Sequence, residues 1–181
     1  MRSKISLILK LLEQSVDLVY QNDKYLIEHS IHEQDLSHRI AFFFENLLRN
    51  YDWFTQNGYS VDVEYNKNFD DSKRVYNKCS GCQLKHCYIK KSGYNIENYI
   101  QICRPDIILH KRGKNNSSYR DDNNLLVIEI KKNISNSKED FAKLSAFTCK
   151  NSDYKYHKGV FINFKSDEAD FEYFDNGKKK E

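Results

Sequence analysis

The fold of this chain is decided by two short stretches, RPDIIL at residues 104–109 and LLVIEIK at residues 125–131. Each contains a short apolar run with β-branched residues, bounded by polar or turn-forming residues, and this pattern predicts a buried strand. Asp106 stands at the start of the first strand, and Glu129 and Lys131 stand near the end of the second. Charged groups in such places are costly unless they are paired or bind a metal. The two stretches therefore favour a divalent-metal site between neighbouring strands.

The composition is that of a globular protein. Its 181 residues predict a single domain, residues 1–181, and 39% hydrophobic and 14% aromatic residues are enough for a core. The net charge of +3 is weak evidence for nucleic-acid binding, because whole-chain charge says little about local fields. No apolar run approaches the roughly 20 residues that span a bilayer. Because Lys10 and Glu13 interrupt the N-terminal apolar run, we expect neither a membrane contact nor a signal peptide.

Apolar periodicity predicts the other elements. Three- and four-residue spacing favours helices at residues 4–20, 33–49 and 138–148, and apolar runs or alternation favour strands at 59–65, 158–164 and 171–174. Ser137 is expected to cap the third helix, with Asp140 three positions on.

The order of these elements indicates an α/β fold. The strands at 59–65, 105–111 and 124–131 are expected to form a meander, and the helix at 138–148 to cross over to the strand at 158–164. The result would be a mixed sheet flanked by helices. Residues 66–103 are expected to be an irregular, cysteine-bearing insertion within this domain.

The three charged strand residues suit the hydrolysis of a phosphodiester. Glu129 and Lys131 share one face of their strand, and Asp106 lies on the neighbouring strand. Two such carboxylates can hold Mg²⁺ or Mn²⁺, which keeps waters and substrate phosphate oxygens. Lys131 could then orient or help to deprotonate the attacking water and stabilise charge on the phosphate. Taken singly, Glu-x-Lys is also typical of a solvated ion pair, and Pro105-Asp106 of a strand entry.

Glu33 is a further candidate ligand. At about 100° per residue it lies within roughly 20° of Ile40 and Phe44 around the helix axis, so it continues the apolar stripe. A carboxylate aimed at the sheet from a helix end could complete the metal shell. The alternative is a first-turn acid that the helix dipole favours.

These residues resemble the PD-(D/E)xK, or restriction-endonuclease-like, nuclease superfamily. Pro105-Asp106 matches the first half of its motif, Glu129-Ile130-Lys131 the second, and Glu33 the acid that many members carry before the sheet. In segments over about residues 30–165, the chain is similar to small uncharacterised bacterial members.

The resemblance implies a restriction-endonuclease-like mixed β-sheet with an α-β-β-β-α-β core. The helix at 4–20 would be an extra N-terminal helix, and the cysteine-bearing loop an addition. The resemblance also implies Mg²⁺-dependent hydrolysis of DNA, less often RNA. Asp106 and Glu129 would bind the metal, Lys131 would position or activate water, and Glu33 would complete the metal shell. A homodimer is a further expectation by analogy.

Two basic residues near the motif have no fixed role in that superfamily. Lys132 is a candidate phosphate contact. Arg39 is expected to be a helix-face or an ion-pair residue.

Cysteines give the chain a second candidate metal site. Cys79, Cys82, Cys87 and Cys103 could supply four thiolates for a structural Zn²⁺, although their spacing is not a strict double CxxC. Free reduced thiols and an iron–sulfur cluster stay open as alternatives. The odd total of five cysteines fits a reducing cytoplasm better than a disulfide scaffold, and Cys149 is expected to be a packing residue.

Three hypotheses of function follow. The first is a Mg²⁺-dependent nuclease that acts on nucleic acid, with DNA favoured over RNA. The second is a catalytically inactive module of the same fold that binds nucleic acid or protein. The third makes the cysteine loop a zinc-ordered interaction surface.

Overall fold

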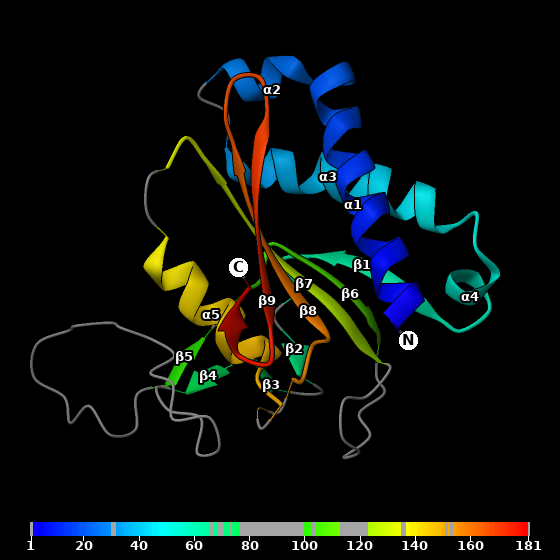
Figure 1. Ribbon diagram of the computed structural model, residues 1–181, viewed down its shortest axis with the longest axis vertical. Coiled ribbons are helices and arrows are strands. Elements are labelled where there is room, and N and C mark those ends of the chain that lie inside the picture. Colours follow the sequence, from blue (N-terminus) through cyan, green and yellow to red (C-terminus); the bar gives the residue numbers. More distant parts are fainter. Residues whose placement is uncertain are drawn as a thin grey trace, which may run out of the picture.

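The structure is a computed structural model of the chain (Figure 1). It describes residues 2–29, 32–65, 67–68, 71–72, 74–76, 100–102, 104–112, 123–134, 137–150, 152 and 154–180.

The described chain contains four N-terminal helices, then a run of strands that a fifth helix interrupts. The helices are α1 (Arg2–Asn22), α2 (Lys24–Glu28), α3 (Glu33–Leu48), α4 (Asp52–Thr55) and α5 (Lys138–Thr148). The strands are β1 (Tyr59–Val63), β2 (Lys67–Asn68), β3 (Asp71–Ser72), β4 (Arg74–Tyr76), β5 (Ile100–Ile102), β6 (Ile107–Lys111), β7 (Asn124–Lys132), β8 (Lys158–Phe164), β9 (Ala169–Asp175) and β10 (Lys178–Lys179).

One six-stranded mixed sheet organises the described chain, with the order β1-β6-β7-β8-β9-β10. The pairs β1·β6 and β6·β7 are antiparallel, which confirms the predicted meander. Strands β7 and β8 are parallel, and α5 lies between them in the sequence, which confirms the predicted crossover. Strands β8, β9 and β10 continue the sheet in antiparallel fashion.

The two faces of the sheet carry different helices. Alternate residues of the central strands divide between two apolar clusters, because successive strand residues point to opposite faces. Ile107, Ile128 and Ile130 pack in the cluster that also contains the apolar stripes of α1 and α3. Ile108 and Val127 pack in the cluster that contains Leu144 and Phe147 of α5. By the same alternation, Asp106, Glu129 and Lys131 belong to the α5 side of the sheet.

Several predictions about single elements need correction. The segment 66–103 was predicted to be irregular, but short strands pair within it as β2·β3 and β4·β5. The expected capping by Ser137 is wrong: it occupies the N-cap position of α5, but its side chain makes no capping hydrogen bond. The strand predicted at 171–174 is the longer β9. Strand β10 follows it through a tight turn at Asn176-Gly177, where both φ angles are positive. Helices α2 and α4 had no predicted counterpart because each is too short to show a periodic stripe.

Within the described part of the chain, no helix combines the length and the apolar character needed to cross a membrane.

Gly159 allows α5 to lie close to the sheet. A Cβ added at this residue would lie 3.1 Å from Thr148 Cγ2 and 3.2 Å from Leu144 Cδ2 on the helix. It would also lie 3.2 Å from Phe174 Cβ on β9. All three contacts are tighter than ordinary van der Waals packing, so any larger residue pushes α5 outward.

We therefore expect Gly159→Ala to lower the free energy of unfolding by about 1–3 kcal/mol, measured by urea denaturation. Gly58→Asn is the matched control, because a Cβ there meets nothing within 4 Å and Asn tolerates the positive φ of 70°. An unchanged denaturation midpoint for Gly159→Ala would show that α5 is not packed this closely.

Candidate functional site

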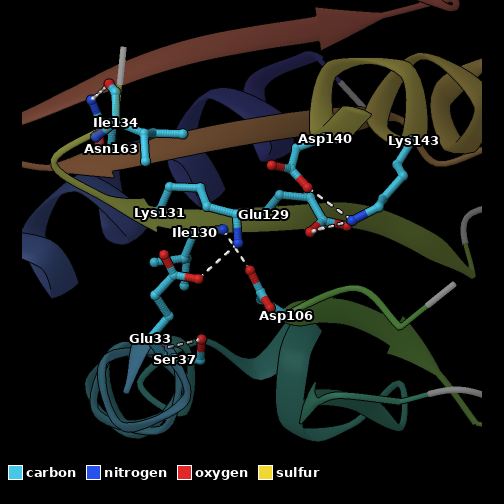
Figure 2. Close-up of polar contacts among 10 residues, drawn as sticks. All are labelled: Glu33, Ser37, Asp106, Glu129, Ile130, Lys131, Ile134, Asp140, Lys143 and Asn163. Atoms are coloured by element: carbon cyan, nitrogen blue, oxygen red, sulfur yellow. Dashed lines mark hydrogen bonds and ion pairs between the residues drawn. The ribbon is translucent and has the colours of Figure 1, made fainter. Parts of the chain in front are cut away.

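The acidic residues of the two decisive stretches meet where β7 ends and β6 begins (Figure 2). Asp106 immediately precedes β6, and its Oδ2 accepts a hydrogen bond of 2.6 Å from the backbone N–H of Ile130 on β7. The antiparallel pairing of Ile107 with Ile128 sets this approach. Pro105 is buried and holds the chain extended as it enters the strand. The Asp106 carboxylate is thus held against the strand that carries Glu129.

Glu129 is the most deeply buried acid of the site. The residue is only 2% exposed, and its Oε1 has no hydrogen-bond partner. Its Oε2 lies 3.7 Å from the ammonium of Lys143 on α5. The same ammonium donates a hydrogen bond of 2.8 Å to Asp140 Oδ1, one turn earlier on that helix. Glu129 is therefore close to a cation, but half of its carboxylate is unsatisfied.

Burial changes the acidity of both strand carboxylates. Loss of water raises the pKa of Glu129 well above its ordinary value, and the neighbouring Asp106 carboxylate raises it further. Burial also raises the pKa of Asp106 to about 6, against the opposing effects of the Ile130 N–H and of Lys131. Both acids thus lie in a poorly hydrated place, where the Asp106 carboxylate hinders the ionisation of Glu129.

Lys131 extends from the same strand to the helix α3. Its Nζ donates a hydrogen bond of 2.7 Å to Glu33 Oε2, and both side chains are partly exposed (Figure 2). Burial alone would lower the pKa of Lys131, but the hydrogen bond and the charge of Glu33 outweigh it and raise that pKa. Lys131 is therefore a protonated donor at neutral pH.

The structure thus unites the four predicted residues in one region but not in one metal shell. The charge of Asp106 raises the pKa of Glu129, whereas Glu33 forms an ion pair with Lys131. Across the residues that the structure describes, no group of three or more His, Cys, Asp or Glu side chains is placed to hold a metal ion. A metal would have two carboxylates available in this arrangement, the buried Glu129 and the partly buried Asp106.

The two other basic residues near the motif have structural partners. Lys132 Nζ donates to the backbone oxygen of Leu26 at 3.1 Å and to that of His29, so it ties the end of β7 to α2. The prediction of Lys132 as a phosphate contact is therefore corrected: its ammonium serves the backbone. Arg39 forms the expected ion pair, at 2.8 Å from Asp23.

Asp140 and Lys143 were missed as site residues. Asp140 is only 6% exposed and continues the apolar stripe that α5 forms with Leu144 and Phe147. The same geometry that selected Glu33, a carboxylate in line with a buried stripe, could have found it. The interpretation of Asp140 as part of a helix cap hid that signal.

The cysteine loop cannot be compared with its prediction. Cys79, Cys82, Cys87 and Cys103 lie outside the described residues. Cys149 is fully buried immediately after α5, which agrees with a packing role.

The fold and the site together define an α/β protein with an open mixed sheet and two neighbouring carboxylates, one buried and one partly buried, at the carboxyl end of its parallel strands. In comparisons with family models, curated proteins and solved structures, nothing matches this chain.

The raised pKa of Asp106 predicts that this acid destabilises the metal-free protein at neutral pH. Because its folded pKa of about 6 exceeds the ordinary value of 3.8, folding favours the protonated form, and this contribution is lost as the pH rises through 6. Asp106→Asn removes the charge and keeps an oxygen that can accept the Ile130 N–H. In EDTA at pH 7.5 we expect the variant to be more stable in urea, by about 3 kcal/mol at most.

The gain should disappear at about pH 3, below both pKa values, where the wild-type carboxyl is mostly protonated in the folded and in the unfolded state. A variant that is less stable than the wild type at pH 7.5 would contradict this account of the site.

Proposed function

We propose that this protein is a Mg²⁺-dependent nuclease that hydrolyses phosphodiester bonds of nucleic acid, DNA in the first place. The observation that carries the proposal is the unpartnered Oε1 of the buried Glu129 beside the partly buried carboxylate of Asp106. Native proteins satisfy nearly all buried polar atoms, so such an atom marks a place where a water or an ion belongs. An ion of opposite charge would relieve both the missing bond and the repulsion.

The arrangement of elements supports a restriction-endonuclease-like core. Helix α3, strands β1, β6 and β7, helix α5 and strand β8 follow one another in the order α-β-β-β-α-β, when the short helix α4 and the short strands between β1 and β6 are set aside. Helix α1 precedes this core. The Pro-Asp pair enters β6 and the Glu-x-Lys sequence ends β7, so the motif occupies the strands on which the resemblance places it.

The donor set fits magnesium. Mg²⁺ is bound in proteins by one or two carboxylates and completes its shell with water and substrate phosphate oxygens. Asp106 and Glu129 would hold the ion, or Mn²⁺ in its place. When bound, the ion would polarise the phosphodiester and lower the pKa of a coordinated water.

Lys131 contributes positive charge to the reaction and not a base. Its ammonium is held by Glu33 at 2.7 Å and its pKa is raised, so it is poised to donate hydrogen bonds. In that state it can orient the attacking water and stabilise negative charge that grows on the phosphate. Glu33 is a positioning residue in this mechanism, because it acts on the substrate only through Lys131.

Lys143 provides a second positive charge at the site, on the side of α5. Its ammonium lies 3.7 Å from Glu129 and 2.8 Å from Asp140, so it supplies a cation to the buried acids. Breaking such a buried arrangement would leave uncompensated charge. Lys143 therefore keeps the acids of β7 and α5 together in the metal-free protein.

One observation favours a second candidate function, a catalytically inactive nuclease-fold module that binds nucleic acid or protein. Lys131 and Lys143 already provide cations to Glu33, Asp140 and Glu129, and no three-acid shell exists among the described residues. The zinc-ordered cysteine loop and the homodimer stay predictions, and metal analysis of the purified protein and its mass in solution test them.

The nuclease proposal is tested with two substitutions. We expect Asp106→Ala and Lys131→Ala each to lower the rate of Mg²⁺-dependent DNA cleavage by at least about 100-fold, with circular dichroism unchanged. Lys158→Ala is the matched control, because that lysine pairs with Asp175 at the opposite end of β8 and should leave cleavage intact. Full activity in both site variants would refute the proposed mechanism.

Metal binding separates the two candidate functions. We expect calorimetry with Mn²⁺ to detect binding to the wild type, and the thermal midpoint to rise with Mn²⁺ because the ion binds only the folded site. Glu129→Gln, which keeps the shape of the side chain, should lose both effects. If Mn²⁺ does not bind and no substrate is cut, the inactive module is the correct function.

A further inference from the structure

A cleft of about 470 Å³ opens beside the carboxylates, between the end of β7 and the start of α5. It is lined by Lys131, Ile134, Ser137, Lys138, Glu139 and Asp140. One wall is fixed to the sheet, since Asn163 of β8 donates to Ile134 O at 2.9 Å and accepts from Ile134 N at 3.2 Å (Figure 2). Lys131 therefore belongs both to the proposed catalytic centre and to this neighbouring cleft.

The floor of the cleft includes the N-terminus of α5, an 11-residue helix. The first N–H groups of a helix have no partner within it, and the aligned peptide dipoles leave partial positive charge there. Such an end accepts a phosphate readily. The helix end alone identifies no ligand, because water can satisfy the same groups.

Ser137 supplies an independent sign of a missing ligand. Its residue is only 5% exposed, and its Oγ has no hydrogen-bond partner although it stands at the N-cap position of α5. A capping serine normally turns its hydroxyl toward its own helix. Here the hydroxyl makes no such bond, and the residue lines the cleft.

The side chains that line the cleft carry both signs of charge, two lysines and two acids. Asp140 pairs with Lys143 at 2.8 Å, and Lys131 pairs with Glu33 at 2.7 Å. Because these charges offset one another, the helix end and the Ser137 hydroxyl are the features that favour an anion.

We propose that this cleft binds a phosphate group of the nucleic-acid strand next to the phosphodiester that is cleaved. Ser137 Oγ donates a hydrogen bond to that phosphate, the free N–H groups of α5 donate others, and Lys138 adds charge at the rim. The inference rests on the proposed function for the identity of its ligand. In this proposal the start of α5 positions the nucleic-acid strand next to Lys131.

The test begins with phosphate binding in the absence of any metal. Amide NMR spectra of the full chain in EDTA are recorded during titration with sodium phosphate, and again with sodium chloride at equal ionic strength. We expect phosphate alone to shift the amides of residues 137–140 in a saturable way. Ser137→Ala and Lys138→Glu should each weaken this binding by roughly tenfold.

Ser145→Ala is the matched control, because it removes a hydroxyl from the same helix outside the cleft. Equal shifts with both salts, or undiminished binding by Ser137→Ala, overturn the inference. Saturable shifts that the Ser145→Ala variant also loses would mean an adventitious ion only, held by no specific hydroxyl.

The second part of the test measures the rate of cleavage. Oligonucleotides carry a single uncharged methylphosphonate at each successive position beside the cut. We expect one adjacent position to slow cleavage by the wild type about tenfold and to have little effect on Ser137→Ala, which has already lost that contact. Interference that is equal in both proteins refutes the subsite.

The two proposals fail in different ways. If the wild type cuts normally and binds no phosphate in this cleft, the subsite is wrong and the nuclease stands. If no substrate is cut, the nuclease fails whatever the phosphate titration shows.

Discussion

The hydrogen bond from the Ile130 backbone to Asp106, 2.6 Å long, is the contact on which the site depends. It holds a carboxylate that would otherwise turn toward water against the strand that carries Glu129. The resulting negative charge is costly in a poorly hydrated place, and the raised pKa values of both acids express that cost. The lysines near the two acids offset part of this negative charge.

Helices on both sides of the sheet supply the charged partners of the site. On one side α5 brings Lys143, which is paired with Asp140 of the same helix, to Glu129. On the other, α3 brings Glu33 to Lys131, so that this lysine stays charged beside the acids. Because these helices are packed by apolar residues onto opposite faces, the same burial that forms the core also sets the spacing of the charges. The site is thus a consequence of the layered fold.

Much of this arrangement was predictable from local patterns. Apolar periodicity located α1, α3 and α5 and the strands β1, β6, β7 and β8, and the succession of three short strands predicted the meander. The alternation of side chains along a strand predicts from the sequence alone that Glu129 and Lys131 share one face. Such predictions succeed where one physical rule, the burial of an apolar face at a fixed period, dominates. They failed for α2 and α4, which have too few residues to show a period.

The sequence by itself determined which charged residues enter buried strands, since position in an apolar run depends only on neighbours along the chain. Only the tertiary structure decided their partners. Glu33 was a candidate metal ligand and is bound to Lys131, Lys132 holds backbone oxygens of α2, and Ser137 leaves its own helix uncapped. Lys143 reaches Glu129 because α5 packs against β7 and β8. A partner is chosen by distance in space, and packing between elements sets that distance where periodicity within one element cannot.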